Sequence, residues 1–324
     1  MKLGSFVAPD GAQHIGVLLP EGHIADLTAS APEPAFRDML ALIEAGPAAL
    51  ERARELAAAP AVAFDATKVR LLAPLPRPAR LRDFLSFELH VRQARANRYL
   101  LGYGTERTDP AKVEVPKLWY ERPGYYKGNP FSVVGTDADV HWPSYSKIID
   151  YELELGVIIG RAGRNVAAEQ ALSYAFGYTI FNDFSARDAQ YLDMASQLGP
   201  SKGKDFDTGN ALGPWIVTAD ELGDPHNLEM RARVNGETWS HGSSGTMHHN
   251  FAAMIAFASL EESLVPGEVL GSGTVGSGCG LELGRFMKHG DVIELEVSGI
   301  GVLRNRIVAP HVPQVPPLPL RRGA

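Results

Sequence analysis

The run of residues from 150 to 160, Asp-Tyr-Glu-Leu-Glu-Leu-Gly-Val-Ile-Ile-Gly, constrains the fold more than any other part of the chain. Its alternation and apolar content predict a β-strand, in which side chains two residues apart lie on the same face. Glu152 and Glu154 are therefore expected on one face. Two adjacent carboxylates repel each other unless solvent, a cationic side chain or a divalent metal offsets their charge. The apolar residues that follow argue against solvent exposure and favour a cation.

A second predicted strand, residues 178–182, ends in a polar cluster that begins with Asp183. This aspartate is the natural third carboxylate of such a site. Three carboxylates without a neighbouring cysteine or paired histidine suit Mg²⁺, Ca²⁺ or Mn²⁺ rather than Zn²⁺. Spacing alone leaves another interpretation open, in which Glu152 and Glu154 lie on the solvent face of an amphipathic strand and Asp183 lies in a turn.

The composition indicates a globular protein with a small-molecule ligand. The 324 residues are 45% hydrophobic and 21% charged, with a net charge of −7 and a pI near 5.8. Because this charge gives no basic surface, neither nucleic acid nor an anionic membrane is an expected partner. Cys279 is the only cysteine, which excludes an intrachain disulfide and fits a reducing compartment. Neither a signal-peptide core nor a run of transmembrane length is present, so a cytoplasmic location is expected.

The chain divides by pattern into three parts. Residues 1–72 combine short strands with helical segments and predict a small α+β domain. The spaced prolines between residues 74 and 78 mark an extended connector, so a larger domain is expected over residues 73–309. Its predicted strands are residues 132–134, 151–159, 178–182, 215–217, 229–234, 269–271 and 291–297. Its predicted helices are residues 89–99, 167–176 and 250–259. The Pro-rich residues 310–324 are expected to form an extended tail.

Four more residues are candidates for chemistry, each with a structural alternative. Asp83 and His90 flank the start of the helix predicted at 89–99, and their spacing can bring both to one pocket, although a lone histidine is usually not catalytic. Lys204, in a glycine-bearing loop, presents a cation to an anionic substrate or is a solvated loop lysine. Glu282 lies between two leucines after a Gly-rich loop, which is either a structural turn or the support of a buried base.

Taken together, these segments resemble the fumarylacetoacetate hydrolase family, and the resemblance covers residue 81 to about residue 308. Five motifs appear in the family's order. They are Asp83-Phe84 with His90, Asp150-Tyr151-Glu152-Leu153-Glu154-Leu155, Asn182-Asp183-Phe184-Ser185-Ala186-Arg187-Asp188-Ala189-Gln190, Gly203-Lys204-Asp205-Phe206, and Pro266-Gly267-Glu268 through Gly271-Ser272-Gly273-Thr274. One such motif is weak, whereas five in order are specific.

The resemblance implies an α+β, mainly β fold, a mixed β-sandwich roll with a small N-terminal α+β domain. It also implies a divalent cation, Mg²⁺ or Ca²⁺ with Mn²⁺ as a further option, bound to the central 1,3-dicarbonyl of an acylpyruvate or diketo acid. The metal ligands it implies are Asp83, Glu152, Glu154 and Asp183. The pair it implies for activating water is His90 and Glu282. The substrate contacts it implies are Arg187, Gln190, Lys204, Tyr126 and Thr274.

The activity implied by the resemblance is hydrolysis of a carbon–carbon bond in a β-diketo acid, in aromatic or related catabolism. Hydratases, decarboxylases and isomerases of 2-keto acids share the scaffold and remain the alternative. Relatives with acylpyruvate or oxaloacetate substrates carry a Glu where this chain has Gln93, which favours the pairing of His90 with Glu282. Residues 99–119 are expected to build the wall that selects substrate. The resemblance also implies a homodimer, with strands such as residues 292–297 offering apolar surface.

Overall fold

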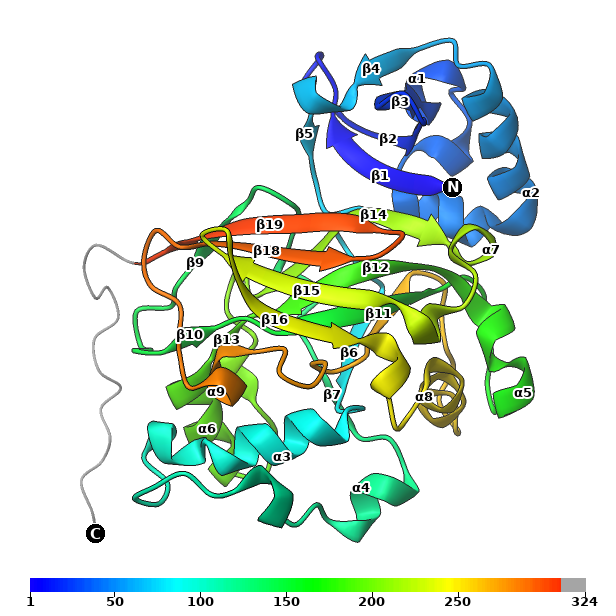
Figure 1. Ribbon diagram of the computed structural model, residues 1–324. Helices are drawn as coiled ribbons and strands as arrows, with labels where there is room; N and C mark the ends of the chain where they lie inside the picture. Colours follow the sequence, from blue (N-terminus) through cyan, green and yellow to red (C-terminus); the bar gives the residue numbers. More distant parts are fainter. Residues whose placement is uncertain (310–324) are drawn as a thin grey trace, which may run out of the picture.

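The computed structural model describes residues 1–309, in which a small N-terminal lobe lies beside a larger lobe of stacked sheets (Figure 1). The tail predicted for residues 310–324 lies outside the described residues. No helix within residues 1–309 is both long enough and apolar enough to cross a bilayer. The predicted α+β class with a mainly β large domain is confirmed, because two extended sheets form the body of the large lobe.

The N-terminal lobe is a small antiparallel sheet backed by helices. Its elements are β1 (Lys2–Val7), β2 (Gln13–Leu18), β3 (His23–Asp26), α1 (Leu27–Ser30), α2 (Met39–Ala58), β4 (Ala63–Asp65) and β5 (Arg70–Leu71). Asp26 and Asp38 begin the two helices by accepting hydrogen bonds from Ala29 N and Ala41 N. Strand β1 also pairs with β14 (Asn210–Thr218), so the lobe's sheet continues into the large lobe. The division at residues 72 and 73 stays a prediction.

The first sheet of the large lobe holds the strands that carry the predicted acids. In the order β4-β3-β2-β1-β14-β12-β11-β17-β6-β7, β11 lies between β12 and β17. The bounds in this lobe are β6 (Arg80–Phe84), β7 (Tyr125–Lys127), β8 (Val133–Val134), β11 (Leu153–Ile159), β12 (Ala175–Asp183) and β17 (Glu268–Gly271). All seven residues of β11 are buried, which explains their nearly continuous apolar run.

A second sheet packs on the first and encloses the main core. Its order is β16 (Glu237–Ser243), β15 (Glu229–Val234), β18 (Val292–Val297), β19 (Gly301–Val308) and β9 (Asp139–His141). Buried Ile293 and Leu295 of β18 join a core cluster with Leu155 and Val157 of β11. The expectation that residues 292–297 offer apolar surface for dimerisation was therefore wrong for Ile293, Leu295 and Val297, which are buried within one chain, whereas Val292 is half-buried. The dimer itself stays a prediction.

The helices of the large lobe lie below the sheets and at one end of them (Figure 1). They are α3 (Glu88–Ala96), α4 (Lys117–Glu121), α5 (Ala168–Ala171), α6 (Arg187–Ala195), α7 (Ala219–Leu222), α8 (Phe251–Ala258) and α9 (Gly280–Leu283). Short 3₁₀ turns extend α3 and α5, at Arg98–Leu101 and Leu172–Tyr174. The single helix predicted at 167–176 was wrong, because β12 starts at Ala175 and pairs there with Ile159.

Candidate active site

Four carboxylates meet at one edge of the first sheet. Asp83 lies near the end of β6, Asp183 ends β12, and Glu152 and Glu154 lie at the start of β11. These ends coincide because β11 runs antiparallel to β12 and β17, while β17 runs parallel to β6. One oxygen from each side chain lies within 4.8 Å of the others, and all four residues are buried. The structure thus brings together the four residues that the family resemblance proposed as metal ligands.

Burial, with repulsion between the acids as a smaller cause, raises the pKa values of three of these carboxyl groups. Burial, followed by the charge of Asp183, raises the pKa of Asp83 well above its ordinary value. Burial and the neighbouring Asp83 likewise raise the pKa of Glu154. Burial also raises the pKa of Asp183 to about 6, against the opposing charge of Lys204. Asp83 Oδ1 and Asp183 Oδ1 are buried and accept no hydrogen bond. Four hard oxygen donors with unused acceptor capacity fit a divalent cation.

Two buried cations balance part of this charge. Lys204 Nζ lies 2.5 Å from both Glu152 Oε2 and Asp183 Oδ2. Arg187 contacts Glu152 Oε1 at 2.8 Å on its other side. Burial alone would raise the pKa of Glu152, but these two cations outweigh burial and lower it. Glu152 is therefore the acid of the cluster that loses its proton most readily, and the two predicted substrate-binding cations also contact a candidate metal ligand.

The raised pKa values of Asp83 and Glu154 predict how metal affinity depends on pH. A metal displaces the protons that the raised pKa values of Asp83 and Glu154 retain, so its affinity should rise with pH. We expect up to about a tenfold gain per pH unit for each proton released, between pH 5 and 8. Metal titration calorimetry in buffers of different ionisation enthalpy measures the released protons directly. An affinity that is flat over this range, with no proton release, would contradict the assignment.

The stability of the metal-free protein should also depend on pH. Because the folded pKa of Asp183 is raised, the folded state keeps a proton that the unfolded chain releases. Stability should therefore fall as the pH rises from about 4 to about 6 in the absence of metal. Thermal unfolding with a chelator present, compared with unfolding at saturating metal, separates this effect from the metal's own stabilisation.

Gly271 allows the close approach of Asp83 to the cluster. An added Cβ at Gly271 would lie 2.5 Å from Asp83 Oδ1 and 2.7 Å from the ring of Phe181. We expect Gly271→Ala to destabilise the fold by about 1–3 kcal/mol and to weaken metal binding by about 10- to 100-fold. The matched control is Gly156→Ala, because a Cβ at this paired glycine meets only ordinary contacts of 3.6 Å or more. Equal losses in both variants would contradict the role of Gly271.

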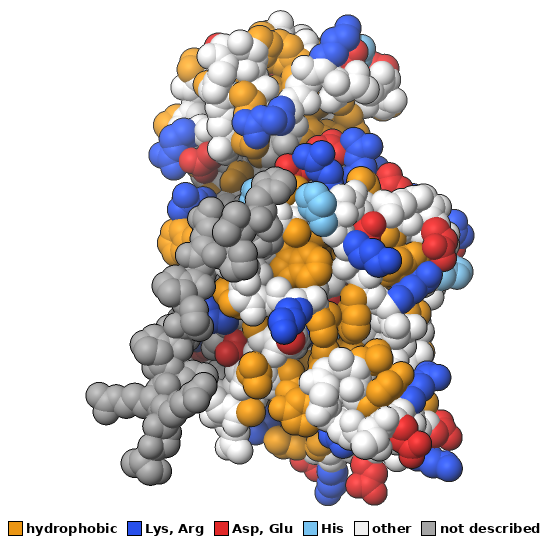
Figure 2. All heavy atoms as spheres, turned by 90° about the vertical axis from the view of Figure 1, so that its left-hand side faces the viewer, with side chains coloured by type: hydrophobic (Ala, Val, Ile, Leu, Met, Phe, Trp, Pro, Cys, Tyr) orange, Lys and Arg blue, Asp and Glu red, His pale blue; other side chains and the backbone are white. Residues whose placement is uncertain are grey.

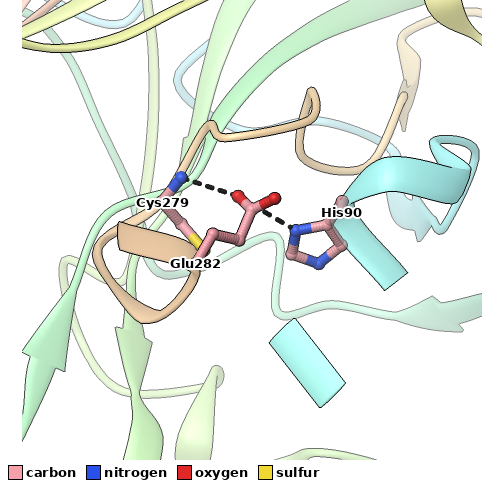
Figure 3. A group of neighbouring side chains, drawn as sticks. All are labelled: His90, Cys279 and Glu282. Atoms are coloured by element: carbon pink, nitrogen blue, oxygen red, sulfur yellow. Dashed lines mark hydrogen bonds and ion pairs between the residues drawn. The ribbon is translucent and has the colours of Figure 1, made fainter. Parts of the chain in front are cut away.

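His90 and Glu282 form a second group beside the acids, brought together by α3 and α9. His90 Nδ1 lies 3.3 Å from Glu282 Oε2. The backbone N–H groups of Ser277 and Cys279 donate to the same carboxylate, at 2.8 and 2.9 Å. Figure 3 shows the imidazole presenting Nδ1 to Glu282 while its other nitrogen points away. Glu282 therefore favours the tautomer with the proton on Nδ1 and leaves Nε2 as an acceptor.

Cys279 supports this pair through its backbone rather than its thiol. The thiol lies close enough to His90 and Glu282 to complete a possible metal-ligand triad. However, burial and the charge of Glu282 raise the pKa of the Cys279 thiol well above its ordinary value. A neutral thiol is a poor ligand and a poor nucleophile. Cys279 is thus a small buried residue in a glycine-rich turn.

Sequence reasoning missed Asp150 as a site residue. This fully buried carboxylate accepts hydrogen bonds from Gly280 N and Leu281 N, which begin α9. Its Oδ2 also accepts from Arg187 Nε at 2.8 Å. Asp150 therefore links the guanidinium beside Glu152 to the helix that carries Glu282. It stood within the Asp-Tyr-Glu-Leu-Glu motif, but only the pairing of β10 (Ile149–Asp150) with β13 (Ser185–Ala186) reveals this contact.

A cavity of about 520 Å³ joins these groups. Nine of the predicted site residues line it, and they are Asp83, His90, Tyr126, Glu152, Glu154, Arg187, Gln190, Lys204 and Thr274. Asp183 and Glu282 are not among the residues that line the cavity. Asp183 accepts a hydrogen bond from the lining residue Tyr126, whose Oη lies 2.6 Å away. From the segment expected to select substrate, Leu101 and Trp119 line the cavity.

The sequence comparison now decides the family. Residues 81–308, most of the chain, match the family described as fumarylacetoacetate (FAA) hydrolase, C-terminal. The chain belongs to the fumarylacetoacetate hydrolase family. This membership and the acidic cluster together support a divalent metal ion in the site.

Relatives in the fumarylacetoacetate hydrolase family carry different activities. The chain is 32% identical over 312 residues to the oxaloacetate tautomerase fahd2, mitochondrial, of Xenopus laevis, covering 95% of this chain and 90% of that one. A solved fumarylacetoacetate hydrolase from Exiguobacterium antarcticum matches with a TM-score of 0.73 at 29% identity, covering 96% and 100%. Maleylpyruvate hydrolase from Sphingobium sp. SYK-6, solved with manganese and pyruvate, shares the fold with a TM-score of 0.72 at 23% identity, covering 95% and 99%. The family therefore leaves the reaction open between hydrolysis and isomerisation.

Proposed function

We propose that this protein hydrolyses a carbon–carbon bond in a β-diketo acid of the acylpyruvate or fumarylacetoacetate type. The observation that carries the proposal is the pairing of His90 with Glu282 beside the four-carboxylate cluster. Tautomerisation needs only proton transfer at carbon, whereas hydrolysis needs a base positioned to activate water. A histidine whose Nδ1 faces a carboxylate has the form of such a base.

The residues have distinct roles in the proposed reaction. A divalent ion held by Asp83, Glu152, Glu154 and Asp183 would polarise the two carbonyl oxygens and offset the charge of the departing enolate. His90 Nε2 accepts a proton from water as the water oxygen adds to one carbonyl carbon. The adjacent carbon–carbon bond then breaks, and the departing carbon takes a proton from the imidazolium. The products are a carboxylic acid and a shorter ketone or keto acid.

The polar lining around the acids holds the substrate in this scheme. Lys204 and Arg187 place positive charge next to Glu152. This positive charge stabilises the negative charge that develops on the substrate oxygens. Gln190 Oε1 accepts from Arg187 Nη1 at 3.0 Å, which orients its amide in the cavity wall. The hydroxyls of Tyr126 and Thr274 complete the polar lining of the cavity.

A second candidate function is tautomerisation of a 2-keto acid such as oxaloacetate. The 32% identity to an oxaloacetate tautomerase over 95% of this chain favours it. In this reaction His90 would move a proton between carbon and oxygen of the substrate, and no water would be consumed. A hydratase or decarboxylase would use the same metal-binding acids.

The test is a spectrophotometric assay of metal-stripped protein against acylpyruvates and fumarylacetoacetate-like diketo acids, with Mg²⁺, Mn²⁺ or Ca²⁺ restored. Loss of the enol absorbance only with metal, and formation of an acid and a ketone or keto acid, are expected. Interconversion of oxaloacetate tautomers with no cleavage of any diketo acid would replace the proposal by the second candidate. The same experiment selects among the three metals.

We also propose that the protein works as a homodimer in the cytoplasm. The support for the dimer is exposed apolar surface on α6 and the loop after it, where Leu192, Met194 and Leu198 are 70%, 57% and 87% exposed. Hydrophobic side chains also gather on the lower half of the face shown in Figure 2. Sedimentation that gives a monomer at micromolar concentration would overturn the dimer.

A further inference from the structure

The face of β6 opposite Asp83 carries a fully buried arginine, Arg82. Side chains alternate along a strand, and paired residues of neighbouring strands share a face. The register of β6 with β17 and β7 therefore places Glu268 and Tyr125 on the face of Arg82, and Tyr126 on the face of Asp83. Glu268 is also fully buried, and neither it nor Arg82 lines the cavity. One face of these strands thus serves the acids, and the other holds a buried ion pair.

The guanidinium of Arg82 contacts several partners at once. Its Nε lies 2.6 Å from Glu268 Oε1, and its Nη2 lies 2.9 Å from Glu262 Oε1. Its Nη1 donates to Tyr125 Oη at 3.0 Å and to the backbone oxygen of Ala258 at 3.1 Å. The guanidinium carbon also lies 5.0 Å from the centre of the Tyr125 ring. Because a buried ion pair gains little stability over apolar side chains of similar volume, stability alone does not explain this arrangement.

Strand β7 is a short edge strand that connects this ion pair to the acids. It has three residues, lies at the end of the sheet and pairs with β6. On one face, Tyr125 holds it to Arg82. On the other face, Tyr126 Oη donates to Asp183 Oδ2 at 2.6 Å, while the buried Asp183 Oδ1 has no hydrogen bond. The position of β7 therefore decides whether Tyr126 reaches this carboxylate and orients it.

We propose that Arg82 is a positioning residue for the metal-binding acids. Because its guanidinium fixes Tyr125, it keeps β7 where Tyr126 can donate to Asp183. Glu268 in turn holds the guanidinium in place. Lysine cannot perform this role, because a single ammonium group does not offer the separate N–H groups that reach the glutamate and the tyrosine together. The inference concerns the metal site, so it holds for cleavage and for tautomerisation alike.

The test separates positioning from stability. The double variant Arg82→Met/Glu268→Met replaces the buried ion pair with apolar side chains, so its melting temperature should stay near that of the wild-type protein. Its Kd for Mn²⁺, measured by calorimetry, should rise about tenfold, as expected when a hydrogen-bond partner of a metal ligand is displaced. Tyr126→Phe should raise the Kd by a similar factor. The triple variant should bind Mn²⁺ no more weakly than Tyr126→Phe alone, because both changes remove the same hydrogen bond.

A milder variant, Arg82→Lys, keeps a cation beside Glu268 and so leaves no unpaired buried charge. It should also raise the Kd for Mn²⁺ about tenfold, because it loses the contact with Tyr125. The matched control is Arg80→Lys. Arg80 lies on the same face of β6 and contacts the same two glutamates, at 3.3 and 3.6 Å, but the described part of the chain shows no hydrogen bond from it to Tyr125. Its variant should keep the wild-type Kd.

Three results would each overturn the inference. The first is a wild-type Kd for Mn²⁺ in Arg82→Lys and in the double variant. The second is a wild-type Kd in Tyr126→Phe, or losses that multiply in the triple variant. The third is an equal loss in Arg80→Lys, which would make the effect general to this face of the sheet. None of these measurements depends on turnover, so failure of the inference and failure of the proposed function are distinguishable.

Discussion

Replacing Asp83 with asparagine is expected to abolish metal-dependent turnover while stabilising the metal-free protein. Asparagine keeps the shape of Asp83 but removes one of the four buried carboxyl groups. Turnover should fall by a factor of about a thousand or more, because the metal would lose an anionic ligand that faces the reacting carbonyls. Burial is the main cause of the raised pKa of Glu154, and repulsion by Asp83 adds to it. Because the substitution ends this repulsion, the melting temperature of the metal-free protein should rise.

The measurement is a pair of melting curves, with chelator and with saturating Mn²⁺. In the wild-type protein metal should stabilise the fold by about 2.7 kcal/mol at a hundredfold excess over Kd. In Asp83→Asn this stabilisation should be nearly lost. Asp207→Asn is the control, since Asp207 is exposed and outside the cluster. A metal-free Asp83→Asn that melts below the wild-type protein would contradict the electrostatic account.

The second large effect is expected on removing the carboxylate of Glu282. Glu282→Gln keeps one oxygen, which can accept from only one of Ser277 N and Cys279 N, and His90 loses its anionic partner. Hydrolysis should fall by about 10²–10⁴-fold, the usual contribution of a positioned general base. Metal affinity should stay near that of the wild-type protein, because Glu282 lies outside the four-carboxylate cluster.

A double-mutant cycle shows whether the pair acts as a unit. His90→Gln alone, Glu282→Gln alone and the double variant should all show similar turnover, since either change removes the same base. Calorimetry with Mn²⁺ provides the internal control for the metal site. Multiplicative losses in the double variant would contradict a shared role. Cleavage of a diketo acid by Glu282→Gln at the rate of the wild-type protein would contradict the assignment of this protein as a hydrolase.

The metal-binding acids differ in how far sequence could predict them. Glu152 and Glu154 followed from the alternation of one strand, and both do line the cavity. Asp83 depended on the family resemblance. It reaches the cluster because β6 pairs in parallel with β17, so that Asp83 faces Gly271, a residue far away in sequence. Periodicity describes one strand at a time and holds no information on which distant strand lies beside it.

Contacts of the supporting residues were the least predictable part of the site. Lys204 looked like a loop lysine, yet it is buried between Glu152 and Asp183. Asp150 and Arg187 meet because β10 pairs with β13. Such information lies in the tertiary arrangement.

The pairing of β1 with β14 has a consequence for any shortened form of the enzyme. The apolar side chains of Leu3, Leu42 and Ile43 share one core cluster with Ile158 and Ile216 of the large lobe. A fragment that begins at residue 73 would leave those two isoleucines facing water and part of the β14 edge unpaired. Unpaired strand edges beside exposed apolar surface promote self-association. The first residues of the chain thus protect the catalytic sheet from aggregation.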